Sequence, residues 1–353
     1  MRNILQVLQI EGRGGVQELV CNLACKLSEK GDSVSRFTFL GASKEYINLY
    51  ENVGIKVCIS PYKPNDIRNI RLLRENIKEN NIDLVHVHNT YPQILCSILI
   101  WGRLSRVKLL VTEHSTTSAR RRFKLLRFLD ELTYVPYTKI ICVSESVEQS
   151  AKGWLKHISD DKFVTVENGI EIDRFRKAEP VPRKDLRFKD SDFVIISVGR
   201  LVPGKGFCTI LDAMELLPDS YKLVIIGSGP QHDELEERIN MKGLKERVVM
   251  TGSIRNVENY LKSGDLYVSA SHTEGFGLTI IEASAAGLPV LATRIPAYQA
   301  LLPQNQLFTV GNANELAQLV LRNDYSYSNE LSLLHSVDKM VDSYSKIYDT
   351  SVG

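Results

Sequence analysis

Residues 271–283 read SHTEGFGLTIIEA, and the interpretation of the whole chain starts from this stretch. The apolar run 266–268 comes just before it and predicts a buried strand. Small residues continue through Ala286, which predicts a helix that Gly287 and Pro289 end. A strand, a glycine-containing loop and a helix in this order indicate an α/β protein.

Two carboxylates bracket the predicted turn, Glu274 in the loop and Glu282 in the helix. The first backbone N–H groups of a helix have no partner within the helix, so those of residues 277–279 favour an anion. A phosphate at this point, with a carboxylate on each side to bind hydroxyl groups, suits a nucleotide sugar. Taken singly, each glutamate is more simply explained as an exposed surface residue.

Length and composition indicate a soluble protein with two domains. The chain has 353 residues, which is more than one typical domain, and its 43% hydrophobic and 24% charged residues are ordinary for a globular protein. Its net charge of +2 favours no particular partner. Six scattered cysteines, without metal-ligand spacing, predict the reduced thiols of a cytosolic protein: Cys21, Cys25, Cys58, Cys96, Cys142 and Cys208.

No targeting or membrane segment is expected. Residues 1–3 lead directly into a predicted strand, 4–10, without a cleavage-like site, so the sequence predicts no signal peptide. No apolar stretch approaches the 18 residues that a membrane-spanning helix needs. We therefore expect a cytoplasmic protein.

Both halves of the chain alternate between strand and helix patterns, which predicts two doubly wound domains that face each other across a cleft. A stretch rich in proline and charge, 177–189, is the expected linker, which gives domains of 1–178 and 190–336. The first domain has predicted strands at 4–10, 34–40, 56–59, 83–89, 108–112, 139–143 and 163–166. The second has predicted strands at 193–198, 223–226, 248–250, 266–270 and 290–292, and 331–348 is expected to be a final helix.

The first predicted strand leads into a glycine turn at Gly14 and Gly15. Glycines let a phosphate or another polar ligand approach the backbone, although a plain tight turn explains them equally well. The full dinucleotide fingerprint is absent, which argues against a nicotinamide dehydrogenase.

Histidines mark two strand ends in the first half. His86 and His88 point to the same face of one strand, and His114 follows the next. Ligands of open α/β sheets bind at the carboxyl ends of strands, so His88 is expected to contact a ligand. The alternatives are a metal site, for which no third ligand is near in sequence, and a hydrogen-bonded structural role for His86.

A basic stretch, 119–129, interleaves cations with large apolar residues. This pattern suits either an anionic membrane surface or an ordinary amphipathic helix that packs Leu125, Leu126 and Leu129 into the core. Nucleic-acid binding is not expected, because the charge is confined to this stretch. The cations of the basic stretch are Arg120, Arg121, Arg122, Lys124 and Arg127.

Asp190 and Asp192 form an Asp-x-Asp pattern, which we interpret as a solvated turn and not a metal site.

Arg200 and Lys205 share one glycine-rich loop after a predicted strand. Two fixed cations and a helix N-terminus can stabilise the charge that develops on a departing nucleoside diphosphate, without a metal. The chain resembles glycosyltransferase family 4, the retaining transferases with the GT-B fold, over nearly its whole length. The motifs that carry this resemblance lie at 14–16, 85–88, 112–115, 143–146, 168–175, 199–206, 227–230, 251–252 and 274–282.

The resemblance implies an acceptor-side first domain, a second domain that binds the sugar donor, and a last helix (about 337–353) that crosses back to the first. It implies direct roles in the reaction for His88, Arg200, Lys205 and Glu274. It implies sugar-donor binding by Gly15, Gly199, Gly229, Ile254, Gly275, Phe276, Gly277, Leu278, Thr279 and Glu282. On the acceptor side it implies Gly14 and His114, and it implies no metal and no cofactor.

The reaction implied is the transfer of a hexose or N-acetylhexosamine from a nucleotide-diphosphate sugar, with retention of configuration. The resemblance favours a uridine diphosphate donor, with guanosine diphosphate mannose as the other choice. The acceptor would be a glycan or a polyprenyl-linked glycan of a surface polysaccharide, at the inner face of the cell membrane. Such carboxylates bind substrate and do not act as a glycosidase pair. The alternative is a non-catalytic subunit that binds a sugar nucleotide within a glycan assembly complex.

Overall fold

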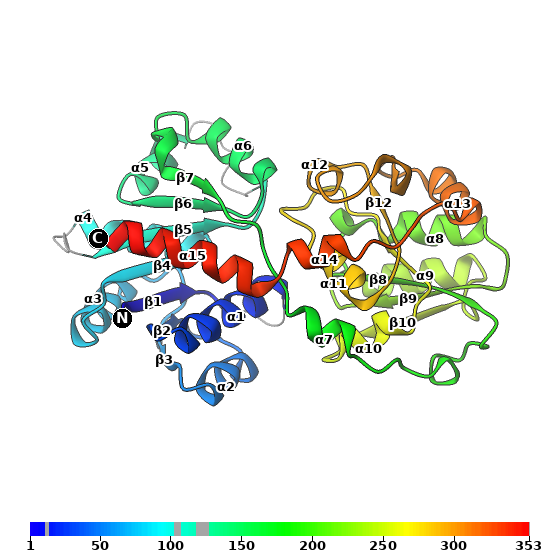
Figure 1. The fold of residues 1–353 in the computed structure, drawn as a ribbon, viewed down its shortest axis with the longest axis horizontal. Helices are drawn as coiled ribbons and strands as arrows, with labels where there is room; N and C mark the ends of the chain where they lie inside the picture. The colour runs from blue at the N-terminus through cyan, green and yellow to red at the C-terminus, as the bar shows by residue number, and fades with distance from the viewer. Residues whose placement is uncertain (11–13, 102–106, 118–126, 353) are drawn as a thin grey trace. The chain divides into compact units, whose positions relative to one another are not determined.

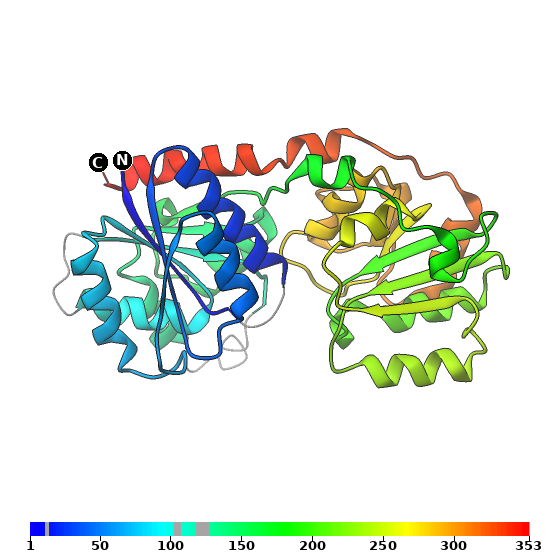
Figure 2. The ribbon, with the colours of Figure 1, turned by 90° about the horizontal axis from the view of Figure 1, so that it is seen from below.

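The computed structural model describes residues 1–10, 14–101, 107–117 and 127–352. The chain divides into two compact units. The first comprises Met1–Gly169 and Val337–Gly353, and the second comprises Ile170–Ser336. Each unit is an open parallel sheet with helices on both faces (Figures 1 and 2). This is the expected pair of doubly wound α/β domains.

The first unit has a seven-stranded sheet in the order β3-β2-β1-β4-β5-β6-β7. The strand order reverses between β1 and β4, and open α/β sheets bind ligands at the carboxyl ends beside such a switch point. The strands are β1 (Asn3–Leu8), β2 (Ser33–Thr38), β3 (Lys56–Ile59), β4 (Leu84–His88), β5 (Lys108–Glu113), β6 (Lys139–Cys142) and β7 (Phe163–Thr165). Its helices are α1 (Gly15–Glu29), α2 (Lys44–Asn52), α3 (Asn69–Glu79), α4 (Thr90–Trp101), α5 (Arg127–Tyr134), α6 (Glu145–Trp154) and α15 (Val337–Val352).

The second unit has a six-stranded sheet in the order β10-β9-β8-β11-β12-β13, which reverses between β8 and β11. The strands are β8 (Phe193–Val198), β9 (Tyr221–Ile226), β10 (Val248–Gly252), β11 (Leu266–Ser269), β12 (Val290–Thr293) and β13 (Leu307–Phe308). Its helices are α7 (Ile172–Arg176), α8 (Phe207–Glu215), α9 (His232–Met241), α10 (Val257–Lys262), α11 (Leu278–Ala286), α12 (Pro296–Gln299), α13 (Ala313–Arg322) and α14 (Glu330–Leu334).

The boundary between the units differs from the expected one. It falls after Gly169 and not at 178, and the presumed linker belongs to the second unit. Its buried side chains include Leu186 and Phe188, and Arg183 makes a two-pronged ion pair with Asp265 at 2.8 Å. The composition of 177–189 indicated an exposed linker because charged residues and prolines surround its few buried apolar side chains.

Two shorter expectations also need correction. The final helix is interrupted after α14, because the carbonyl oxygen of His335 accepts a hydrogen bond from the N–H of Ile170 and Ser336 forms a β-bridge with Ile170. The Asp-x-Asp turn is not fully solvated. Asp192 is buried, and its Oδ2 accepts a hydrogen bond of 2.8 Å from the N–H of Lys189.

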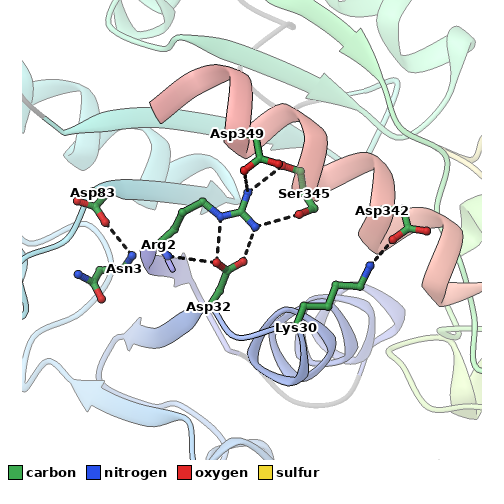
Figure 3. Close-up of polar contacts among 8 residues, drawn as sticks. All are labelled: Arg2, Asn3, Lys30, Asp32, Asp83, Asp342, Ser345 and Asp349. Carbon is green, nitrogen blue, oxygen red and sulfur yellow. Dashed lines mark hydrogen bonds and ion pairs between the residues drawn. The ribbon is translucent and has the colours of Figure 1, made fainter. Parts of the chain in front are cut away.

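Helix α15 is fixed to the first unit by a polar cluster around Arg2 (Figure 3). The guanidinium donates from Nε to Asp32 Oδ1 at 3.0 Å, and from Nη1 to the backbone oxygen of Ser345 at 2.8 Å and to Asp349 Oδ1 at 3.0 Å. The Asp32 side chain is only 6% exposed, so the ion pair with Arg2 offsets the cost of removing this carboxylate charge from water.

Exposed ion pairs extend the same contact along α1, which lies beside α15 in Figures 1 and 2. Lys30 pairs with Asp342, and Lys26 lies 3.5 Å from Asp338. Exposed pairs of this kind contribute little to stability. The buried Arg2–Asp32 pair therefore dominates the polar part of the contact. Among the described residues, no helix combines the length and the apolar composition needed to cross a bilayer.

Candidate active site

Glu274 is the centre of the polar contacts that follow β11. Its Oε1 accepts hydrogen bonds from Ser271 Oγ at 2.8 Å and from the Tyr298 hydroxyl at 3.2 Å, and it forms an ion pair with Lys205. The Tyr298 hydroxyl has one proton, which it donates to Glu274, so its 2.7 Å contact with Ser269 Oγ is a bond that it accepts. The carboxylate is thus held in one orientation.

Close packing of two loops brings Lys205 to Glu274. Gly206 has φ +67°, and a β-carbon at this position would lie 2.1 Å from the backbone oxygen of Ala270. The N–H of His272 donates to the backbone oxygen of Gly204 at 2.8 Å. Only glycine permits this approach, which joins the loop after β8 to the loop after β11.

Arg200 lies in the same loop as Lys205 but differs in its surroundings. Its side chain is exposed, and among the described residues it makes no hydrogen bond or ion pair. The loop thus presents one cation that is held by a carboxylate and one that is available to a ligand.

Helix α11 begins directly after this cluster. Gly277 precedes it with φ +109°, and a β-carbon there would lie 2.8 Å from Cε1 of Tyr298. Leu278 and Thr279 are half-buried in the first turn. Burial is the main cause that raises the pKa of Tyr267, and the charges of Glu282 and Glu274 add to it. Both carboxylates therefore lie close enough to the Tyr267 hydroxyl for their negative charges to raise its pKa.

The remaining predicted sugar-donor residues follow neighbouring strands. Gly199 and Gly229 lie in the loops after β8 and β9, where a β-carbon at Gly229 would come within 2.4 Å of the backbone oxygen of Leu201. Gly199 has no comparable restriction, since its nearest contact would be 3.5 Å. Ile254 follows β10 and is half-buried.

Gly275 and Phe276 are buried in the loop before α11. The ring of Phe276 packs edge-on against His335, with 5.2 Å between ring centroids. This contact gives the Phe276 side chain a packing role.

The histidines of the first unit form a cluster on β4 and β5. His86 is fully buried, with Nε2 at 2.7 Å from Thr112 Oγ1 and Nδ1 at 2.7 Å from the Tyr348 hydroxyl. This satisfies both of its ring nitrogens, as expected for a structural histidine. His88 is also fully buried, and its Nδ1 lies 3.1 Å from Nε2 of His114.

Burial keeps these imidazoles uncharged at neutral pH. It lowers the pKa of His86 to about 3 and that of His114 to about 4, and it lowers the pKa of His88 well below the ordinary value. Neutral rings can each donate one hydrogen bond and accept another. The cluster is therefore suited to binding hydroxyl groups and unsuited to pairing with phosphate charge.

The glycine turn is described only in part, because residues 11–13 lie outside the described ranges. Gly14 and Gly15 are exposed at the start of α1. A β-carbon at Gly14 would meet only the flexible end of the Gln17 side chain, at 2.5 Å.

The basic stretch also lies largely outside the described residues. Four of its cations (Arg120, Arg121, Arg122 and Lys124) and two of its predicted core residues (Leu125 and Leu126) therefore have no structural account. Arg127 begins α5 and pairs with the buried Glu131 at 3.1 Å. Leu129 is 59% exposed and Phe128 64% exposed, so the expectation that Leu129 packs in the core is wrong.

One group of side chains could converge on a metal ion, namely His232, Asp233 and Glu236 at the start of α9. Exposed acidic groups of this kind are common without an ion, and the group assigns no function. Two residues that contact Glu274 were not predicted to belong to the site: Ser271 and Tyr298. Ser271 lies three residues before Glu274, but nothing in the sequence links Tyr298 to that carboxylate.

Two family models match the chain in succession. The model for Glycosyltransferase Family 4 matches residues 13–174, and the model for Glycosyl transferases group 1 matches residues 179–325. Two doubly wound units of this kind define a glycosyltransferase with the GT-B fold. Within that class, the chain belongs to glycosyltransferase family 4.

Related proteins act on different sugars and acceptors. The GPI3 subunit of phosphatidylinositol N-acetylglucosaminyltransferase from Saccharomyces cerevisiae is 23% identical over 95% of this chain and 77% of its own length. The UDP-Gal:alpha-D-GlcNAc-diphosphoundecaprenol alpha-1,3-galactosyltransferase of Escherichia coli is 29% identical over 65% of this chain and 62% of its own. Among solved structures, Anabaena HepE in complex with UDP and glucose has a TM-score of 0.85 at 19% identity, covering 99% of this chain and 100% of its own.

Proposed function

We propose that this glycosyltransferase moves a hexose or N-acetylhexosamine from a uridine diphosphate sugar to a hydroxyl of a glycan or lipid-linked acceptor. The transfer retains the anomeric configuration and uses neither a metal nor a cofactor beyond the nucleotide sugar. The cluster around Glu274 is the observation that carries this proposal. Lys205, Ser271 and Tyr298 all contact Oε1, and among the described residues Oε2 has no hydrogen-bond partner.

A carboxylate with one fixed oxygen and one available oxygen suits the recognition of sugar hydroxyls. The Oε2 atom of Glu274 would accept bonds from the transferred sugar, while the contacts on Oε1 keep the group in place. Glu282, half-buried on α11, would bind the ribose of the nucleotide. Both carboxylates act as acceptors of hydrogen bonds, and neither attacks the sugar.

Cations and backbone dipoles would hold the diphosphate. Arg200 is exposed, Lys205 is half-buried in the same loop, and the first N–H groups of α11 add a partial positive charge. Negative charge grows on the diphosphate as the bond to the sugar breaks, so fixed positive charge stabilises the transition state more than the bound substrate. This arrangement supplies the stabilisation that a metal gives in other transferases.

The relatives support a uridine diphosphate donor and a lipid-linked acceptor. HepE was crystallised with UDP and glucose, and the two relatives above are named for transfer to phosphatidylinositol and from UDP-galactose to a diphosphoundecaprenol-linked sugar. We carry both features to this chain as parts of the proposal, together with a cytoplasmic location at the inner membrane face. Gly14 and His114 would then lie on the acceptor side, Gly15 would line the sugar-donor site, and His88 would contact the transferred sugar.

The membrane part of the proposal rests on the segment around α5. Two exposed apolar side chains, Phe128 and Leu129, follow the cations at 120–124 and Arg127 in the sequence. Apolar and basic groups together favour an anionic bilayer surface. Replacing Arg120, Arg121 and Arg122 with serine should release the protein from phosphatidylglycerol vesicles. Unchanged sedimentation with those vesicles would reject the membrane contact while leaving the catalytic proposal intact.

The catalytic proposal is tested first by sugar-donor binding. Thermal unfolding is followed with UDP, GDP and ADP sugars, in EDTA and then in Mg²⁺. A ligand at about 100 times its Kd adds about 2.7 kcal/mol to native-state stability. We expect a selective shift with a UDP sugar that EDTA does not remove. Glu274→Gln should reduce the shift given by the intact sugar more than that given by UDP alone, and Glu237→Gln, an exposed change on α9, serves as the control.

The reaction itself is tested by following the anomeric proton of the product by NMR. A product with the configuration of the sugar donor agrees with the proposal, and an inverted product contradicts it. A requirement for Mg²⁺ in turnover would contradict the metal-independent part alone.

A further inference from the structure

His88 and His114 contact each other through one nitrogen of each ring. The Nδ1 atom of His88 lies 3.1 Å from Nε2 of His114. Their outer nitrogens, Nε2 of His88 and Nδ1 of His114, are buried and have no hydrogen-bond partner among the described residues. Buried polar atoms without a partner are uncommon in native proteins, and each calls for an explanation.

Proton counting restricts what this pair can present. A neutral imidazole carries one proton, and one of the two inner nitrogens must carry a proton for the hydrogen bond to exist. If His88 donates, then His88 Nε2 is an acceptor and His114 Nδ1 carries the other proton. If His114 donates, both outer roles are exchanged. The two outer nitrogens therefore always have opposite polarity, and the two rings always share the same tautomer.

The groups around His88 and His114 keep both imidazoles neutral, with one proton on each ring. Burial lowers the pKa of both imidazoles, and the nearby positive charge of Arg36 lowers that of His88 further. The titratable groups that act on His88 are His86, His114 and Arg36, and His86 is itself neutral at pH 7. No carboxylate is among them, so nothing in this group favours an imidazolium.

The rings are also held in place. The centroid of His86 lies 4.1 Å from that of His88, and His86 is fixed on both sides by Thr112 and Tyr348. The orientation of His88 is thereby limited by a neighbour that cannot turn without losing two hydrogen bonds. The pair can change state by moving protons while the rings stay in position.

We propose that His88 and His114 form a two-state proton pair, in which His114 is a positioning residue that sets whether His88 Nε2 donates to or accepts from a sugar hydroxyl. In a change of state one proton enters at His88 Nε2, the Nδ1 proton passes to His114 Nε2, and His114 Nδ1 gives up its own proton to the group that it contacts. Each ring stays neutral. The ligand role rests on the proposed function, whereas the shared tautomer does not.

The test uses the full chain labelled with ¹⁵N-histidine, and long-range ¹H–¹⁵N spectra at pH 7. His88→Gln and His114→Gln assign the two rings. We expect both rings as Nδ1–H or both as Nε2–H. One ring of each kind, or a charged ring, would overturn the proposal. His272→Gln, an exposed change in the second unit, should leave both signals unchanged.

A second experiment separates positioning from structure by turnover. His114→Phe removes the hydrogen-bond partner of His88 and should lower kcat by about tenfold, which corresponds to ~1.4 kcal/mol, with a smaller effect on the KM of the sugar donor. His114→Gln keeps an amide near the Nε2 position and should restore most of kcat. Equal losses of kcat in both variants would reject the positioning role. Shared tautomers in a protein that binds no nucleotide sugar would uphold the pair and defeat the proposed function.

Discussion

The hydroxyl of Tyr348, near the end of α15, lies 2.7 Å from Nδ1 of His86 on β4. Both groups are fully buried, so Tyr348→Phe leaves a ring nitrogen without a partner and should cost about 1–3 kcal/mol. Urea unfolding followed by tryptophan fluorescence measures this, because both tryptophans, Trp101 and Trp154, belong to the first unit. Tyr344→Phe removes only a weaker 3.3 Å contact and should cost less. Equal costs would show that the hydrogen bond to His86 contributes nothing specific.

The polar cluster of Figure 3 predicts a large difference between two cations that contact α15. Arg2→Met leaves Asp32 buried and unpaired and should cost about 3–5 kcal/mol. Lys30→Met breaks an exposed pair with Asp342 and should cost about 0–1 kcal/mol. The same fluorescence measurement compares the two variants. Similar losses would mean that the cluster acts as a set of surface charges.

The neutral histidines predict that stability falls in mild acid. The folded-state pKa of His114, about 4, lies below the unfolded value of about 6.5, so the unfolded chain binds the extra proton between these pH values. The free energy of unfolding therefore has its full value above pH ~6.5. It declines by about 1.4 kcal/mol per pH unit for each such histidine as the pH falls towards 4.

Unfolding free energies at pH 7, 6 and 5 measure that slope. His114→Gln removes one titrating group and should make the slope shallower by about 1.4 kcal/mol per unit. If the unfolding free energy of His114→Gln changes with pH as steeply as that of the parent protein, the neutral state of the His114 ring is contradicted.

The two glycines at the ends of α11 predict unequal effects of the same substitution. Both have positive φ, +109° at Gly277 and +95° at Gly287, so alanine is strained at either by about 1–2 kcal/mol. Gly277→Ala also places a methyl group 2.8 Å from the Tyr298 ring, whereas the space beside Gly287 is open. We expect Gly277→Ala to lose sugar-donor binding in a calorimetric titration and Gly287→Ala to keep it. Loss in both would indicate that α11 itself unfolds.

Local sequence patterns predicted every strand of the two sheets except β13. The bounds of β3 and β8 are those expected, because short apolar and β-branched runs bounded by polar or turn residues mark strands. Helix α13 was not predicted, although a signal was present: the Asn312 side chain caps it by accepting a 3.1 Å bond from the N–H of Glu315.

Contacts between distant residues could not be predicted in this way. The sequence indicated that Lys205 and Glu274 both belong to a polar site, but it carried no information that their charges would pair. Tyr298 was missed because its hydroxyl reaches Glu274 only through the packing of α12 against the loop after β11. The family resemblance supplied roles for single residues, and the coupling between His88 and His114 became visible only from the distance between their rings.

The first unit is built from two segments of the chain that are separated by the whole of the second. A ribosome therefore makes 170–336 before it makes the helix that supplies Tyr348 and the partners of Arg2. During that interval His86 lacks one hydrogen-bond partner, and the surface that α15 covers is open to other proteins. Because the chain is made from its N-terminus, the second unit can complete its fold before the first. A nascent chain stalled before residue 337 lacks α15, so its first unit cannot complete its fold and exposes surface that chaperones bind.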